Sequence, residues 1–102
     1  MFESYAVLRE VKKNDVRSLH ILLLSSLEAL HYGRKELVTL PEETTRSGVV
    51  EQVKNHLEKK GIPAELVFEG EEAIVLPLPD NAEPFERLRY GLVELLERKY
   101  PA

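Results

Sequence analysis

Three histidines, His20, His31 and His56, are the side chains best suited to acid/base or metal chemistry in this sequence. An imidazole exchanges a proton or ligates a metal near neutral pH. His20 and His31 fall near one face of a predicted helix, but they are eleven residues apart, roughly 16 Å along a helix, too far to share an ion or a proton. No serine or carboxylate stands beside a histidine at a catalytic spacing. We therefore expect no catalytic residue, no metal and no cofactor, and the chain is not predicted to be an enzyme.

The segment between a predicted strand and the next helix is the best candidate ligand site. It offers hydroxyls, free backbone N–H groups, a glycine and one arginine, which together suit an anion. Its residues are Thr44, Thr45, Arg46, Ser47 and Gly48. Ordinary capping of the helix explains the serine and the threonines equally well, so both interpretations stay open.

Basic side chains form a second candidate site, for nucleic acid. The residues concerned are Lys12, Lys13, Arg17 and Arg46. Residues 1–61 hold ten Lys or Arg against nine Asp or Glu, whereas residues 62–102 hold four against nine. The acidic tail should repel a phosphate backbone, so any contact must come from a local basic surface in the first sixty residues. No aromatic residue is interleaved with these cations along the chain, so a stacking platform for single strands is not indicated.

The composition sets the class of protein. A chain of 102 residues with 43% hydrophobic and 31% charged residues is expected to form a single globular domain. Without cysteine it has no disulfide, no thiolate metal site and no cysteine nucleophile. No apolar run is long enough to span a membrane, so we expect a cytoplasmic protein. The few amides and many charged residues resemble the composition of thermophile proteins.

Hydrophobic periodicity predicts an α+β domain over residues 1–102, a two-layer helix-on-sheet sandwich of order β-α-β-α-β-β-α. The first strand competes with a helix over residues 2–13. The predicted elements are strand Ser4–Glu10, helix Val16–Tyr32, strand Lys35–Leu40, helix Ser47–Lys60, strands Ala64–Glu69 and Glu72–Pro77, and helix 83–100. Glutamates crowd the last strand pair and indicate a solvated acidic hairpin tip rather than a metal site.

The C-terminal helix carries one apolar stripe, which is either part of the core or an interface between two copies. The stripe consists of Phe85, Leu88, Leu92, Leu95 and Leu96. If the first two helices cover one face of the sheet, this helix must pack on an edge, on the opposite face or on a second copy of itself. We expect a homodimer formed through this helix.

Residues 6–79 resemble the βαβαββ domains of the Alba nucleic-acid-binding family, the sulfur-relay TusA/SirA family and the C-terminal domain of bacterial initiation factor three. The similarity to Alba lies in Val7-Leu8-Arg9-Glu10, the following lysines, the leucine-rich segment and Glu36-Leu37-Val38-Thr39. It implies a dimer that binds DNA or RNA through lysines before the first helix, which match Lys12 and Lys13, and through Arg46. The similarity to the sulfur-relay family lies in the stretch Leu37 to Thr44, but persulfide transfer is excluded because the required cysteine is absent.

A winged helix is the alternative architecture. Gly48–Lys60 would then be the recognition helix, the Glu69-Gly70-Glu71 hairpin the wing and the last helix a dimer arm. Only about seven residues, 41–47, remain for the preceding helix, and an acidic wing would face the phosphates.

These observations lead to two hypotheses for the function. The first is a small non-catalytic association domain that works as a homodimer through protein–protein contacts. The alternative is an Alba-like DNA- or RNA-binding protein that uses a local basic surface.

Overall fold

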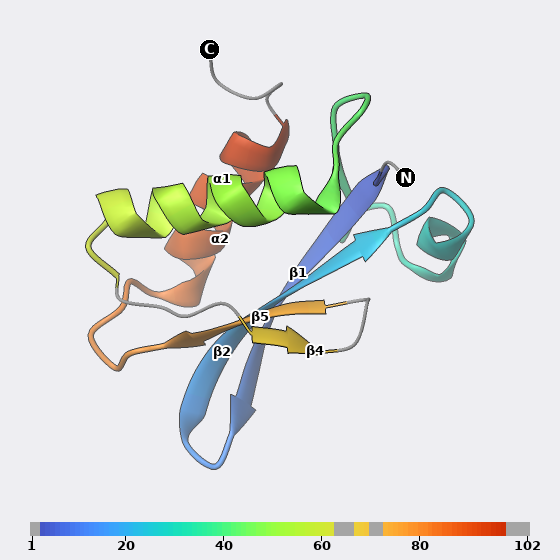
Figure 1. Cartoon of the computed structure of the whole chain (residues 1–102). Helices are drawn as coiled ribbons and strands as arrows, with labels where there is room; N and C mark the ends of the chain where they lie inside the picture. The colour runs from blue at the N-terminus through green and yellow to red at the C-terminus, as the bar shows by residue number, and fades with distance from the viewer. Residues whose placement is uncertain (1–2, 63–66, 70–72, 98–102) are drawn as a thin grey trace.

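The computed structural model describes residues 3–62, 67–69 and 73–97 and shows an α+β fold (Figure 1). The elements are β1 (Tyr5–Lys13), β2 (Val16–Leu24), a 3-10 helix η1 (Glu28–His31), β3 (Val38–Thr39), α1 (Arg46–Lys59), β4 (Val67–Glu69), β5 (Ala73–Leu78) and α2 (Phe85–Glu97). The strands form one sheet of order β3-β1-β2-β5-β4, in which all neighbours are antiparallel. The predicted α+β class is confirmed.

The predicted helix Val16–Tyr32 is wrong, because this segment contains strand β2 followed by η1. From Leu19 to Leu23 the buried side chains recur at every second residue, as a strand requires. The run of leucines fits the helical period equally well and concealed this alternation. Asn14 and Asp15, with φ of 52° and 65°, form the two-residue loop that joins β1 to β2. Such a loop with positive φ at both positions is typical of a tight hairpin.

The other predicted elements are present with changed limits. The first strand is confirmed and the competing helix is wrong, since β1 pairs with β2 along its whole length. The strand predicted over Lys35–Leu40 is reduced to β3. The hairpin of β4 and β5 and the last helix are present, but residues 63–66, 70–72 and 98–100, including the acidic hairpin tip, lie outside the described residues.

Helix α1 matches the predicted helix closely because both of its ends are specified locally. Thr45 caps the first turn, its Oγ1 accepting from the backbone N–H of Gly48 at 3.1 Å. At the other end Gly61, with φ of 69°, and Ile62 donate their N–H groups to the carbonyls of Glu58 and Leu57. No helix occupies residues 41–45 before α1, so the winged-helix alternative is wrong.

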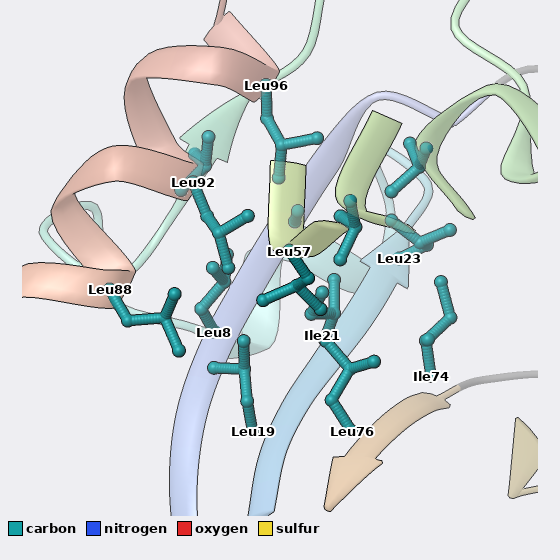
Figure 2. Close-up of a cluster of buried hydrophobic side chains, with 14 of the residues drawn as sticks. Leu8, Leu19, Ile21, Leu23, Leu57, Ile74, Leu76, Leu88, Leu92 and Leu96 are labelled. Carbon is teal, nitrogen blue, oxygen red and sulfur yellow. The ribbon is translucent and has the colours of Figure 1, made fainter. Parts of the chain in front are cut away.

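One core cluster joins both helices to the sheet (Figure 2). The helices contribute Val49, Val53 and Leu57 from α1 and Leu88, Leu92 and Leu96 from α2. The three central strands contribute alternate residues: Ala6, Leu8, Leu19, Ile21, Leu23, Ile74, Leu76 and Leu78. Neither helix, over the residues described, is long and apolar enough to cross a membrane.

Candidate functional site

The strand residues that alternate with the core residues lie on the opposite side of the sheet, which we call the outer face. None of these residues belongs to the core cluster. Across the strands, Arg9 is paired with His20 and His20 with Val75. The neighbouring rows towards the hairpin loop hold Val11, Ser18 and Pro77, and then Lys13 and Val16.

The outer face is apolar in part and cationic. Val16 is 53% exposed, and Val11, Leu22 and Val75 are half-buried. Arg9 and Lys13 are exposed, and β1, β2 and β5 place no Asp or Glu on this face. Glu69 of the edge strand β4 is paired with Ala73, so the register assigns it to the same face. The whole chain has a net charge of −4, so the part of the outer face that β1 and β2 form is opposite in sign to the chain as a whole.

The segment after β2 folds back onto one end of the outer face. The guanidinium of Arg9 lies over the ring of Tyr32, with Cζ 5.3 Å from the ring centroid. This distance suits a cation–π contact. Between the segment and the sheet lies a groove of about 530 Å³, lined in part by Tyr5, Leu30, Tyr32, Arg34 and Thr39.

Strand β1 has a free edge. Among the residues that the structure describes, β3 pairs only with Tyr5 and Ala6, and the seven residues from Val7 to Lys13 have a strand on one side only, β2. The carbonyl of Ser4 accepts from the N–H of Leu40, towards the β3 side. Because backbone groups alternate sides along a strand, Leu8, Glu10 and Lys12 turn their N–H and C=O groups towards that same side.

In the predicted anion-binding loop, residues 44–48, the threonine hydroxyls have protein partners. Thr44 is 1% exposed and donates from Oγ1 to the carbonyl of Pro41 at 2.6 Å. Thr45 Oγ1 caps α1 and lies 3.3 Å from Ser47 Oγ. Arg46 is the first residue of α1. Local capping thus accounts for Thr45, and anion binding stays a prediction.

The predicted basic set is divided between two ends of the molecule. Lys12 and Lys13 end β1 and Arg17 begins β2, where Lys12 and Arg17 are paired. Arg46 instead starts α1, whose N-terminal end lies beside the start of β1 through the bond from Glu3 N–H to the Thr44 carbonyl. Strand β1 separates these two ends by roughly 25 Å. Arg17 is also engaged, with Glu10 at 3.5 Å and with the carbonyl of Glu83 at 3.1 Å.

The apolar stripe of the C-terminal helix lies in the chain's own core. Leu88, Leu92 and Leu96 are at most 3% exposed, and Phe85 and Leu95 are partly buried against the same cluster. Leu88, Leu92 and Leu96 are therefore core residues of their own chain and leave no exposed surface for a second copy. The homodimer stays a prediction.

The three histidines lie in three different places. His20 belongs to the outer face, and His31 is exposed at the end of η1. His56 packs between α1 and α2, where its Nε2 is buried without a hydrogen-bond partner. Burial, reinforced by the charge of Lys60, lowers the pKa of His56, and Glu83 partly opposes this change. Within the described ranges, no group of three His, Asp or Glu side chains could hold a metal ion.

The interpretation of the sequence missed Arg9, His20 and Tyr32 as neighbours. The Asn-Asp pair at 14 and 15, between two apolar segments, is the signal that could have placed the first two on adjacent strands. Nothing local to Tyr32 indicates its contact with Arg9. Comparisons of the chain with protein-family models, with curated proteins and with solved structures found no match.

Proposed function

We propose that this chain is a non-catalytic association domain that forms a homodimer by pairing the free edges of two β1 strands. The observation that carries the proposal is the edge of residues 7–13, which within the described part of the chain pairs with β2 and with no second strand. A free edge with unpaired N–H and C=O groups is a template for another strand. Two copies would pair antiparallel about a two-fold axis perpendicular to the sheet. In the two-layer arrangement that we propose, the helices of both copies then lie on one side of a continuous sheet.

The charges along the edge favour one register. An antiparallel pair about a two-fold axis places one residue opposite itself, and the middle of the edge offers Arg9, Glu10 or Val11 for this position. Arg9 or Glu10 on the axis would set like charges against each other, which destabilises a pair. Val11 on the axis avoids this and places Glu10 of each copy opposite Lys12 of the other.

Backbone hydrogen bonds favour the register with Val11 on the axis, and the contact of Arg9 with Tyr32 limits its one unfavourable pair. Glu10 and Lys12 are among the residues whose backbone groups face outward, so they would form the hydrogen-bonded pairs between the copies. The register also sets Arg9 opposite Lys13, but the Arg9 guanidinium is drawn towards the ring of Tyr32. The two Glu10–Lys12 pairs therefore remain attractive, and the repulsion between Arg9 and Lys13 is reduced.

The absence of cysteine in the chain makes disulfide trapping a direct test. In the proposed dimer the two Val11 residues form a non-hydrogen-bonded pair with Cα atoms about 4.5 Å apart, within the range of a disulfide. We expect Val11→Cys to form a covalent dimer under mild oxidation. The matched control is Val16→Cys on β2, where 53% exposure gives oxidant more access than the half-buried Val11 has, but no symmetric neighbour is present.

Light scattering on the wild-type protein gives the oligomeric state independently of the disulfide. A wild type that stays monomeric at all concentrations, with no more crosslinking of Val11→Cys than of Val16→Cys, contradicts the edge-paired dimer. A crosslink through Glu10→Cys but not through Val11→Cys keeps the edge pairing and contradicts the register.

A further inference from the structure

We infer that the outer face of the sheet binds single-stranded nucleic acid. This activity goes beyond protein association, because the surface is complete in one chain. Arg9 and Lys13 are exposed on it, and β1, β2 and β5 add no acidic residue to this face. Glu69, which the register assigns to the same face, belongs to β4, three strands away from β1. A chain with a net charge of −4 that gathers cations on one face attracts anions there and repels them elsewhere.

The spacing of the two cations suits an extended anionic polymer. Arg9 and Lys13 lie four residues apart on β1, roughly 13 Å, so they would contact different phosphates of one strand. Val11 lies between them on the same face and is half-buried. Along β1, Arg9 and Lys13 therefore offer charge at both ends, and Val11 offers an apolar surface between them on which the face of a base can lie.

Planar groups distinguish a nucleic acid from an acidic protein segment. The Arg9 guanidinium lies over the ring of Tyr32, and His20 is the cross-strand neighbour of Arg9. Guanidinium, phenol and imidazole planes are the surfaces on which unpaired bases stack. Bases in a duplex are already stacked on each other, so the arrangement favours a single strand.

The proposed dimer would enlarge this surface without being required for it. A two-fold axis perpendicular to the sheet leaves both outer faces on the same side, and edge pairing of β1 brings the two Arg9–Lys13 rows next to each other. Binding should then continue from one copy to the next. A chain that stays monomeric would still bind through one face, so the two proposals fail separately.

Fluorescence anisotropy with labelled oligothymidylate and oligouridylate, titrated at low salt and then with added salt, tests the charge. We expect Arg9→Glu to weaken binding about tenfold or more and to reduce the salt slope by about 0.7 for each phosphate that the variant no longer neutralises. The matched control is Lys54→Glu, the same charge change at an exposed position of α1, which should retain wild-type affinity. No binding at low salt, or an equal decrease in affinity in both variants, overturns the inference.

A second pair of variants tests the stacking. We expect Tyr32→Leu to weaken binding of the oligonucleotide about tenfold and to leave binding of polyglutamate unchanged. Tyr90→Leu, at a tyrosine of α2 that is 66% exposed, should change neither. If polyglutamate binds as tightly as the oligonucleotide and Tyr32→Leu has no effect, the face recognises charge alone and the inference of a nucleic-acid site is wrong.

Discussion

The imidazole of His56 lies directly against the backbone of α2 at Gly91. A Cβ atom at Gly91 would be 3.3 Å from His56 Nε2 and 3.5 Å from Cε1. A glycine inside a helix costs about 1 kcal/mol relative to alanine. Gly91 therefore makes α2 less stable as a helix, but it leaves room for the His56 ring of α1. The same Nε2 is buried without a hydrogen-bond partner.

A double-mutant cycle measures this contact. In the wild type, the helix propensity gained by Gly91→Ala is offset by displacement of the imidazole, so we expect almost no change in the free energy of unfolding. In a His56→Ala background the same substitution should stabilise the protein by about 1 kcal/mol. Urea denaturation of the four proteins gives the coupling. An equal gain in both backgrounds would show that the ring does not constrain Gly91.

The lowered pKa of His56 makes stability depend on pH. Burial and the nearby Lys60 lower this pKa from the usual value of 6.5. As the pH falls through that value, the unfolded chain takes up a proton that the folded chain does not, so the unfolded state is favoured. The stability present above pH 6.5 should therefore decline as the pH falls towards the folded pKa. Below the folded pKa this group adds no further change.

Chemical denaturation at several pH values checks this dependence. We expect His56→Gln to lose less stability than the wild type between pH values of about 7.5 and 5.5. His31→Gln removes an exposed imidazole far from Gly91 in the chain and serves as the control. If the stability of His56→Gln falls with decreasing pH as steeply as that of the wild type, other groups cause the pH dependence.

Leu92 tests whether the C-terminal helix packs within its own chain. Its side chain is 0% exposed in the core cluster, so Leu92→Ala should lower the free energy of unfolding by about 2 to 5 kcal/mol. Leu95→Ala, at a partly buried position of the same helix, should have a smaller effect. Thermal unfolding at several protein concentrations separates the alternatives, because an interface through this helix would make the melting temperature of the wild type depend more steeply on concentration than that of Leu92→Ala.

The Thr45 hydroxyl tests the capping interpretation of the predicted anion loop. Since Oγ1 accepts from the Gly48 N–H, Thr45→Ala should lower stability by about 1 kcal/mol and Thr45→Asn should retain most of it. Melting curves in buffers with and without phosphate give both results. A melting temperature that rises with phosphate in the wild type but not in Thr45→Ala would instead support an anion at this loop.

Elements bounded by local signals could be predicted from the sequence, and those fixed by long-range pairing could not. Thr45 specifies the start of α1 through its side-chain hydroxyl and Gly61 the end through its backbone N–H, and the predicted limits of this helix agree with the structure to within one residue. The leucines of β2 instead fit two periods, and only pairing with β1 and β5 selects the strand. The candidate site follows the same rule, because Arg9 meets Tyr32 only after β2 has returned alongside β1.

The hairpin loop that decides this topology can itself be improved. Asp15 has φ of 65°, a region that glycine occupies without strain, and an Asn-Gly pair is strongly preferred in such loops. Asp15→Gly relieves the strain but makes the unfolded chain more flexible, so we expect a net gain of about 0.5 kcal/mol. Asp15→Ala should destabilise, because alanine lacks the local hydrogen bonding that lets aspartate adopt this conformation. Denaturation midpoints of the two variants check the order, and a protein stabilised more by alanine than by glycine would contradict the hairpin on which both proposed surfaces depend.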